Sequence, residues 1–427
     1  MNKMYKKPIF LAFTLFIAVQ SYAQLTIEAC YEKARANYPL IKQYGLIEKS
    51  REYNSSNAVR AWLPQIQLSA KATYQSDVTK LPLDFSQIPQ LSYMEVPELT
   101  RDQYNATIEI SQTLWDGGMI GAKRKMIQAN ADAEKAEVEM NLYALKERVN
   151  QLFFGILMCD AMLEQNQLFQ DELQRNFEKI TALVKNGLAN QADIDAVKVE
   201  QLKAKQYFTQ ISHNRKAYLQ MLSAFIGENL DENTSLQKPN EPLATSTEIS
   251  RPELSFFDSK LLFFEASKKE IRADLMPKLG LFITGGYGKP GLNMFEDGFS
   301  AYYIGGVRFS WNIGGFYTSK NRQNMLISNR NAVAIQRETF LFNTSLNKLG
   351  KENEIEKYRQ LLQSDEEIIQ LRTSVKLATE SRVANGTATV TDLMRDITTE
   401  AMAKQDKVLR EIEMLQCVYN LRFITNN

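Results

Sequence analysis

Four short stretches of the chain alternate between apolar and polar residues, as half-buried β-strands do. In 65–76 the residues Ile66, Leu68 and Tyr74 share one face with two alanines, while the residues between them are polar. The other strands are expected over 104–115, 278–288 and 301–312. In 278–288 the alternation is weaker, because Phe282 falls on the polar face. Each stretch has the length of a tilted membrane-crossing strand, about 9–11 residues, although a strand of a soluble sandwich alternates equally well.

Long helical patterns follow the second and the fourth of these strands. Residues 118–185 contain no proline and place apolar residues three or four apart, which is the spacing of coiled-coil packing. A single helix of this length would extend about 100 Å, at about 1.5 Å per residue. A second long helix is expected over 316–384. Shorter helices are expected over 26–62, 191–226, 252–275 and 390–424. Such helices can pack antiparallel along the long ones, either as the wall of a tube or as a solid bundle.

The chain is built from two copies of one unit. An offset of 213 aligns Pro39 with Pro252 and Pro64 with Pro277, and an offset of 199 aligns "VKNGLANQADI" with "VANGTATVTDL". The polar, proline-containing segment between the copies is expected to be a surface connection. The predicted parts are a first repeat at 24–227, a linker at 228–251 and a second repeat at 252–427.

The first 23 residues have the composition of a secretory signal peptide. Three lysines precede an apolar run from Ile9 to Val19, and Ser21-Tyr22-Ala23 fits a cleavage site. The apolar run is too short to span a bilayer. We therefore expect residues 1–23 to be removed on export, leaving a mature chain that begins at Gln24.

Composition argues against catalysis and nucleic-acid binding. Losing the three signal lysines lowers Lys+Arg from 51 to 48, against 50 Asp+Glu, so the mature chain has a net charge of −2 rather than a basic excess. The cysteines Cys30, Cys159 and Cys417 are dispersed, and His213 is the single histidine. These residues form no pattern typical of a metal centre or a catalytic site. We predict no enzymatic activity, no metal site, no cofactor and no nucleic-acid partner.

All three tryptophans lie where an expected strand meets an expected helix. If the strands cross a membrane, Trp62, Trp115 and Trp311 fall at one interface, where indole rings are enriched; the alternative is that they are buried in a core. Four strands cannot close a barrel, and open edges in lipid would leave backbone groups unpaired. Single-chain barrels begin at about eight strands, so two or three copies would have to pool their strands.

The turns between the long and the following helices repeat the motif Asn-Gly. A glycine after the helix permits a left-handed stop, and Asn190 or Thr389 can cap the next helix. Asp193 and Asp392 then stand at the third position of a capping box, where a carboxylate also suits the helix dipole. Either aspartate, repeated around a ring of subunits, could also line a constriction that selects cations.

These features together resemble the TolC-type outer membrane efflux proteins over essentially the whole mature chain. The resemblance rests on the duplication, on Leu63-Pro64 and Met276-Pro277 before strands, on the Gly-Gly pairs after strands, and on the "NGLANQADI" and "NGTATVTDL" turns. It implies an α+β membrane protein with four strands per chain in a shared twelve-stranded trimeric barrel, continuous with a long helical periplasmic barrel. It also implies localisation in the outer membrane.

The resemblance further implies a passive exit duct for efflux or type I secretion. Its partners would be a periplasmic adaptor, or membrane fusion, protein and an inner-membrane transporter of the RND or ABC type. The turn residues expected to contact the adaptor are Asn186, Gly187, Leu188, Asn385, Gly386 and Thr387. Asp392, Arg395 and Asp193 are the expected gate residues. Because Arg395 occupies a position that is acidic in the family, an Asp–Arg network is as possible as an anionic ring. The alternative from another class is a secreted structural or adhesive coiled-coil protein without a channel.

Overall fold

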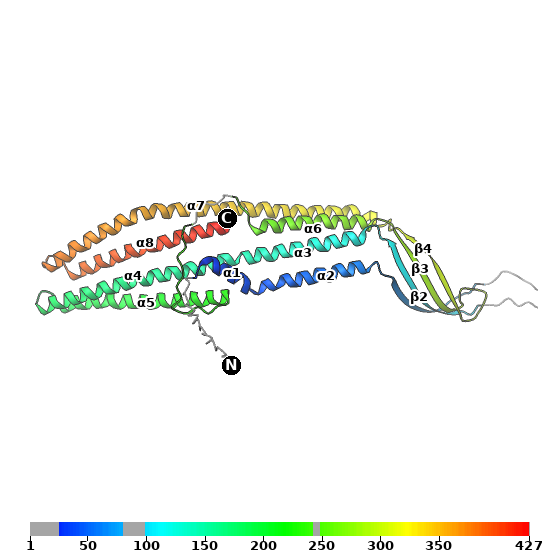
Figure 1. Ribbon diagram of the computed structural model, residues 1–427, viewed down its shortest axis with the longest axis horizontal. Coiled ribbons are helices and arrows are strands. Elements are labelled where there is room, and N and C mark those ends of the chain that lie inside the picture. The colour runs from blue at the N-terminus through cyan, green and yellow to red at the C-terminus, as the bar shows by residue number, and fades with distance from the viewer. Residues whose placement is uncertain (1–24, 80–98, 242–247, 427) are drawn as a thin grey trace, which may run out of the picture. The chain divides into compact units, whose positions relative to one another are not determined.

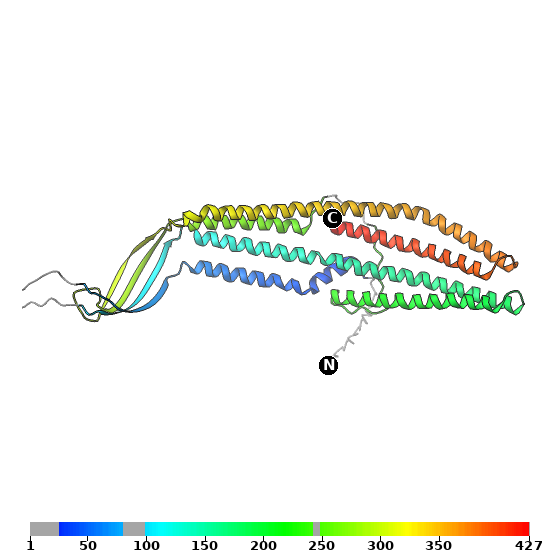
Figure 2. The ribbon, with the colours of Figure 1, turned by 180° about the vertical axis from the view of Figure 1, so that it is seen from behind.

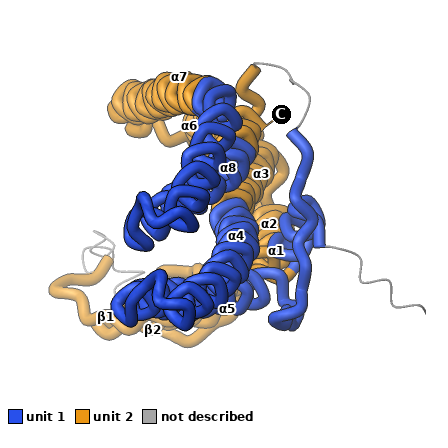
Figure 3. The backbone as a smooth tube through the Cα atoms, turned by 90° about the vertical axis from the view of Figure 1, so that its left-hand side faces the viewer, with its two compact units in different colours: residues 1–36, 148–242, 358–416 blue, residues 37–147, 243–357, 417–427 orange. Residues whose placement is uncertain are grey.

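The computed structural model describes residues 25–79, 99–241 and 248–426. In each predicted repeat, two strands follow the helical segment with which the repeat begins (Figures 1 and 2). The expected signal peptide at 1–23 lies outside the described residues. The chain folds into two compact units, which are coloured separately in Figure 3. Unit 1 comprises 25–36, 148–241 and 358–416, and unit 2 comprises 37–79, 99–147, 248–357 and 417–426 of the described chain. Each unit therefore takes segments from both predicted repeats.

Unit 2 contains a four-stranded antiparallel sheet in the order β1-β2-β3-β4. The strands are β1 (Gln65–Tyr74), β2 (Asp102–Trp115), β3 (Lys278–Lys289) and β4 (Ser300–Ser310). The register places Ile66 opposite Ile110, and Ile110 opposite Ile283. Since directly opposed residues share a face, the apolar positions of all four strands fall on one side of the sheet.

The same unit holds the helices next to the sheet. They are η1 (Pro39–Lys42), α2 (Gln43–Arg60), α3 (Met119–Tyr143), α6 (Pro252–Asp274) and the first part of α7 (Gly315–Ala384). Helix α3 packs against both α2 and α6. Figure 1 shows α2, α3 and α6 leading to the same end of the sheet.

The turn from β2 into α3 depends on two left-handed glycines. Gly117 has φ +69° and Gly118 has φ +86°. The Asp116 carboxylate accepts the backbone N–H groups of Gly118 at 2.9 Å and Ile120 at 2.6 Å, and so caps the helix. A Cβ at Gly117 would lie 2.4 Å from Cβ of Met276, so only glycine fits this close approach. The second Gly-Gly pair, at 314–315, has no positive φ and therefore uses a different turn.

Unit 1 contains α1 (Ile27–Asn37, up to residue 36), most of α4 (Leu145–Lys185), α5 (Gln191–Ile226), the last part of α7 and most of α8 (Val390–Thr425). The ends of α4, α5, α7 and α8 share one hydrophobic core. Its fully or almost fully buried members include Leu173, Ile180, Val197, Leu393 and Ile397. The spacing of these residues along their helices is the coiled-coil spacing seen in the sequence.

Two of the expected helices are interrupted. The helix expected over 26–62 is divided before Pro39, because the residue before a proline disfavours helical dihedrals; Tyr38 is extended, with φ −66° and ψ 128°. The helix expected over 118–185 is divided into α3 and α4 at Ala144. That residue keeps φ −60° and ψ −18°, so the interruption is a local loosening rather than a reversal.

The apolar stripe of α4 is buried as its spacing indicates. Val149 and Ile156 have no exposed surface, and Leu152 is 6% exposed. The stripe is broken at Asn166, which is also buried and accepts a hydrogen bond from Gln170 at 2.6 Å. This hydrogen bond gives the buried amide oxygen a partner within the helix, so the stripe accommodates a polar residue at this position.

No helix in the described ranges is both long enough and apolar enough to pass through a lipid bilayer.

Candidate functional site at the helical tip

The two turns of unit 1 end their long helices with left-handed glycines. Gly187 has φ +74° and Gly386 has φ +68°. In the first turn the N–H of Leu188 donates to the carbonyl of Leu183 at 2.9 Å, and in the second the N–H of Thr387 donates to the carbonyl of Arg382 at 2.8 Å. These bonds satisfy carbonyls that the helix leaves unpaired.

Reciprocal capping boxes begin the helices that follow. The Asn190 side chain accepts the Asp193 N–H at 3.1 Å, and the Asp193 carboxylate accepts the Asn190 N–H at 2.9 Å. Thr389 and Asp392 repeat this exchange at 3.1 and 3.2 Å. The structural role expected for both aspartates is therefore present in both repeats.

The six turn residues expected to contact an adaptor are all exposed, and Leu188 is 72% exposed. An exposed leucine at the end of a helical hairpin is open to a partner, although single exposed leucines are common on protein surfaces. The geometry makes these residues accessible. Their contact with an adaptor remains a prediction.

Asp392 and Arg395 lie together at the start of α8. The Arg395 Nη2 atom is 3.5 Å from the Asp392 Oδ1 atom, and its Nε atom is 3.6 Å from Oδ1 of Asp396. The hydroxyl and the backbone N–H of Thr389 donate to the Asp392 carboxylate and, with Arg395 adding a nearby positive charge, lower the pKa of Asp392. Within one chain the two residues form an Asp–Arg contact, and its part in a gate stays a prediction.

Asp396 is a member of this cluster that the sequence analysis missed. It is 7% exposed and accepts a hydrogen bond from the Thr379 hydroxyl at 2.7 Å, which joins α8 to α7. The signal in the sequence was its place beside Ile397, within the apolar stripe of α8. A charged residue in that stripe must be paired, because an isolated buried carboxylate is costly.

A second missed cluster is centred on Lys376 of α7. Its Nζ atom is 2.8 Å from Oε1 of Glu172 in α4 and 2.6 Å from Oε2 of Glu400 in α8. Lys404 approaches Oε1 of Glu400 at 2.9 Å, and the Thr373 hydroxyl donates to the same oxygen at 2.6 Å. Through Lys376 the cluster joins three helices of unit 1. We call these five residues the Lys376 cluster.

Glu400 is the most buried member, with 1% of its surface exposed. Burial raises the pKa of a carboxylate, but hydrogen bonds from Lys376, Thr373 and Lys404 outweigh it and lower the pKa of Glu400 to about 2. Glu400 occupies a seam position of α8, after Leu393 and Ile397 at spacings of four and three. That spacing was the available signal, since a lone acid in an apolar seam requires a facing cation.

In the described chain Asp193 forms no hydrogen bond or ion pair with Asp392 or Arg395. Within the described residues its hydrogen bonds are those of its own capping box with Asn190. The structure thus brings together two of the three expected gate residues and adds Asp396 beside them. A tip-proximal ion pair between Lys179 and Glu380 also joins α4 to α7.

The tryptophans lie at the helix-proximal end of the sheet in unit 2. Trp62, Trp115 and Trp311 are 38%, 47% and 48% exposed, so none is a core residue. The Trp311 indole N–H donates to the Leu275 carbonyl at 2.9 Å, which fixes that ring at the junction of β4 with the helices. An exposed indole held by a polar contact, as that of Trp311 is, suits a boundary between an apolar and an aqueous region.

The two faces of the sheet differ sharply. The apolar face is exposed on every strand, with Leu68 at 79%, Ile283 at 50% and Val307 at 65%. The opposite face carries polar pairs, among them Glu109 with Arg308 at 2.7 Å. Other polar pairs on this face are Ser69 with Thr107 and Asn105 with Tyr302, each at 2.7 Å. Phe282 does lie on the polar face, where the Arg308 guanidinium stands 4.6 Å from the centre of its ring.

In the part of the chain that the structure describes, no group of His, Cys, Asp and Glu side chains has the geometry of a metal site. The three cysteines are buried and free, and burial raises the pKa of the Cys30 thiol to about 12. A thiol with so high a pKa is a poor nucleophile at neutral pH.

Comparison with known proteins gives one family match. The sequence profile described as "Outer membrane efflux protein" matches residues 30–228. None of the curated proteins compared with the chain matches its sequence. The match covers the first repeat, including its Asn-Gly turn.

Several solved outer membrane channels share the fold of the chain. CusC has a TM-score of 0.70 at 10% identity, covering 99% of this chain and 98% of its own. The outer-membrane channel OprN has a TM-score of 0.69 at 12% identity, covering 93% and 89%. The open state of the MtrE channel of Neisseria gonorrhoeae has a TM-score of 0.65 at 12% identity, covering 94% and 89%. Both repeats therefore have the fold of these channels.

Proposed function

We propose, from the match of residues 30–228 to the outer membrane efflux protein family, that the chain is one of three copies that form an outer membrane exit duct. The observation that carries the proposal is the continuous apolar face of the sheet. It is exposed on all four strands, whereas the opposite face is polar. A lipid-facing exterior and a water-filled interior require this asymmetry.

The edges of the sheet explain why more than one copy is needed. β1 and β4 each have one strand neighbour in the described chain, so each leaves one edge unpaired. In lipid such edges cost several kcal/mol for each unpaired backbone group, so they must pair with another copy. Three copies would join β4 of one to β1 of the next and close twelve strands, as the TolC-type resemblance implies.

The long helix α7 supports assembly independently of the sheet. It exposes large apolar side chains along its length, including Phe342 at 64% and Leu371 at 60%. Burying apolar surface contributes about 25 cal/mol per Å², so faces of this kind favour association between subunits. In the proposed trimer they pack against neighbouring copies.

The proposed mechanism is opening and closing of the helical tip, without a cofactor or a chemical step. The Lys376 cluster and the cluster of Asp392, Arg395 and Asp396 hold α7 and α8 in one arrangement relative to their neighbours in unit 1. Opening requires the ends of α7 and α8 to move, which breaks some of these contacts. A two-state element of this kind can be biased by a protein that binds at the exposed turns.

The partners follow from the proposed role as a duct. The exposed turns at 186–188 and 385–387 would receive a periplasmic adaptor protein, and an inner-membrane RND or ABC-type transporter would supply the energy. The cargo would be small molecules or proteins, in efflux or in type I secretion. Asp193 is proposed as an additional residue of the aperture because its carboxylate lies beside the first of these turns.

Conductance in planar bilayers tests the function. Purified protein should form pores, and Asp392→Ala should alter their conductance or cation selectivity because it removes both a negative charge and an Arg395 partner. Unchanged conductance would exclude Asp392 from the gate, while absence of pores would exclude the duct. A secreted coiled-coil protein would instead remain in the soluble fraction, a reading that the exposed apolar face does not favour.

A further inference from the structure

A bulge in β2 turns Trp115 onto the apolar face of the sheet. Thr113 is opposite Gly280, but Trp115 is opposite Leu279, so the register shifts by one residue between them. Two successive residues, Leu114 and Trp115, therefore both lie on the side of Leu279. Leu114 is 50% exposed and Trp115 is 47% exposed, which places a wide aromatic edge where the apolar face ends.

A surface cleft begins at this aromatic edge, between α3 and α6 within unit 2. Its lining combines Trp115 with three cationic side chains, Lys125 from α3 and Lys269 and Arg272 from α6. We call this site the interfacial cleft. The two glycines that begin α3 also line it, and their lack of side chains keeps it open.

The three cations of the interfacial cleft have no compensating carboxylate. In the described chain none of Lys125, Lys269 and Arg272 takes part in an ion pair, and all three are exposed. Two neighbouring acids are engaged elsewhere: Asp116 caps α3, and Asp274 pairs with Arg322 at 2.9 Å. Three like charges on one cleft attract an anion, because each lowers the energy of a negative group placed between them.

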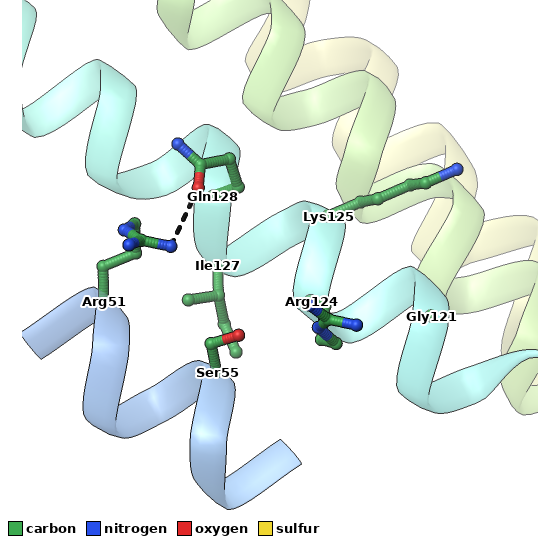
Figure 4. Close-up of a pocket in the computed structure, with 7 residues that line it drawn as sticks. All are labelled: Arg51, Ser55, Gly121, Arg124, Lys125, Ile127 and Gln128. Atoms are coloured by element: carbon green, nitrogen blue, oxygen red, sulfur yellow. Dashed lines mark hydrogen bonds between the residues drawn. The ribbon is translucent and has the colours of Figure 1, made fainter. Parts of the chain in front are cut away.

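The adjacent cleft between α2 and α3 shows the contrast (Figure 4). There the Arg51 guanidinium is engaged by Glu48 and donates to Gln128 at 3.2 Å. Lys125 lines both clefts, and Figure 4 shows its side chain extending toward the side of α6, away from Arg51. Its charge is therefore available to the interfacial cleft.

We propose that the interfacial cleft binds the phosphate headgroup of an anionic phospholipid. The inference rests on the proposed function, which places the apolar face of the sheet in the outer membrane. Lys125, Lys269 and Arg272 would contact the phosphate, Trp115 would pack against the glycerol region, and the acyl chains would continue along the apolar face. An indole beside basic side chains at the edge of an apolar surface is the arrangement that suits a lipid headgroup region.

The test compares lipid binding by the full chain in neutral detergent. Short-chain phosphatidylglycerol should raise the unfolding temperature, and phosphatidylcholine at the same concentration should not. The triple substitution K125Q/K269Q/R272Q should weaken the apparent affinity for phosphatidylglycerol at least about tenfold, since each basic residue near an anionic lipid surface contributes a factor of about five. The control R175Q/K185Q/K205Q removes the same charge from exposed positions of unit 1 and should leave binding unchanged.

Three results would overturn the proposal. The first is an equal loss of phosphatidylglycerol binding in both triple variants, and the second is equal binding by the cleft variant and the unsubstituted protein. The third is that inorganic phosphate alone stabilises the protein as much as phosphatidylglycerol does. If the cleft variant does not assemble, R272Q by itself should weaken phosphatidylglycerol binding about fivefold, and an unchanged affinity would count against the cleft. Failure of the unsubstituted protein to fractionate with membranes would contradict the proposed function instead, and so the two are distinguishable.

Discussion

At the scale of single residues, the tip of unit 1 is held by charges placed inside an otherwise apolar seam. Lys376 is the residue on which this arrangement depends, because it neutralises Glu400 and reaches Glu172 on a third helix. A buried ion pair is weak evidence of stability by itself, but removing one partner leaves an uncompensated charge. The Lys376 cluster is therefore suited to hold one arrangement of helices rather than to add stability in general.

Lys376→Met should destabilise the closed tip. The substitution removes the cation of Glu172 and the α7 cation of Glu400, which keeps only Lys404 of its own helix at 2.9 Å. Breaking partly buried pairs between helices is destabilising, so open events in bilayer recordings should become more frequent. Lys203→Met is the matched control, since Lys203 pairs with Glu200 on the surface and such pairs contribute less than about 1 kcal/mol. Similar open frequencies in the two variants would show that the cluster does not hold the gate.

Acid should open the tip only at low pH. The folded pKa of Glu400 is about 2, below its ordinary value of 4.5, so its stabilising effect is complete above pH 4.5 and is lost as the pH falls toward 2. The pKa of Asp392 is also lowered, which acts in the same direction. In bilayer recordings from pH 7 to pH 3, the pores should stay closed until the lower end of this pH range. Opening near pH 6 would contradict this assignment.

The tip also shows what single residues in a sequence can and cannot predict. The capping boxes at Asn190 and Thr389 were predictable, because Asp193 and Asp392 follow at fixed local spacing. The link from Lys376 to α4 was not, because Glu172 lies 204 residues from Lys376 in the sequence. The seam spacing of Glu400 was an available signal for a buried acid, but only the fold supplies the cation that faces it from α7.

At the scale of elements, the junction between strand and helix is the most constrained part of unit 2. Gly117 has a positive φ and also lies against Met276, so two independent features exclude a side chain there. Gly118 also has a positive φ, but a Cβ added there would meet no other atom within 4 Å. The sequence predicted that the motif is a turn. It did not predict that the second Gly-Gly pair adopts a different backbone, because dihedral angles depend on how close the neighbouring element approaches.

Gly117→Ala should therefore lower stability more than Gly118→Ala. The strain of a left-handed alanine costs about 1–2 kcal/mol at either position, and a Cβ at Gly117 would add a clash at 2.4 Å with Met276. Thermal unfolding of the detergent-solubilised protein should show the larger decrease in midpoint for Gly117→Ala. Equal midpoints would mean that the junction relaxes to accept the methyl group.

Helices and strands were predicted well where periodicity is strong and less well where it is interrupted. The pattern over 191–226 coincides with α5, whereas 118–185 proved to be two helices that meet at Ala144. Tyr143, next to that break, is buried, and its hydroxyl donates to the Phe423 carbonyl at 2.7 Å. A tertiary contact of this kind has no local signal in the sequence, so the break could not be predicted.

At the scale of the whole molecule, an exposed apolar sheet with open edges and a long helix with exposed apolar side chains make the isolated chain incomplete. The sequence already predicted this incompleteness, because four expected strands are too few for a closed barrel. It could not choose between two and three copies. Strand tilt and the angle between neighbouring copies decide that number, and no spacing within one chain encodes them.

Cross-linking should identify the edge that joins the copies. The substitutions Lys71→Cys in β1 and Tyr302→Cys in β4 place both thiols on the polar face of the two edge strands, and in a trimer closed edge to edge the β1 of one copy adjoins the β4 of the next. Oxidation of the double variant should give covalent dimers and trimers, and each single variant should give no covalent ladder up to the trimer. A ladder that extends beyond three copies would exclude a closed ring of three.

The mass of the assembly extracted from the outer membrane is the most direct test of the account. Native mass spectrometry of protein solubilised from membranes in detergent should give three copies of the chain, with no detergent-free soluble form. A monomer that stays dissolved without detergent would contradict the pooling of strands, and with it the exit duct.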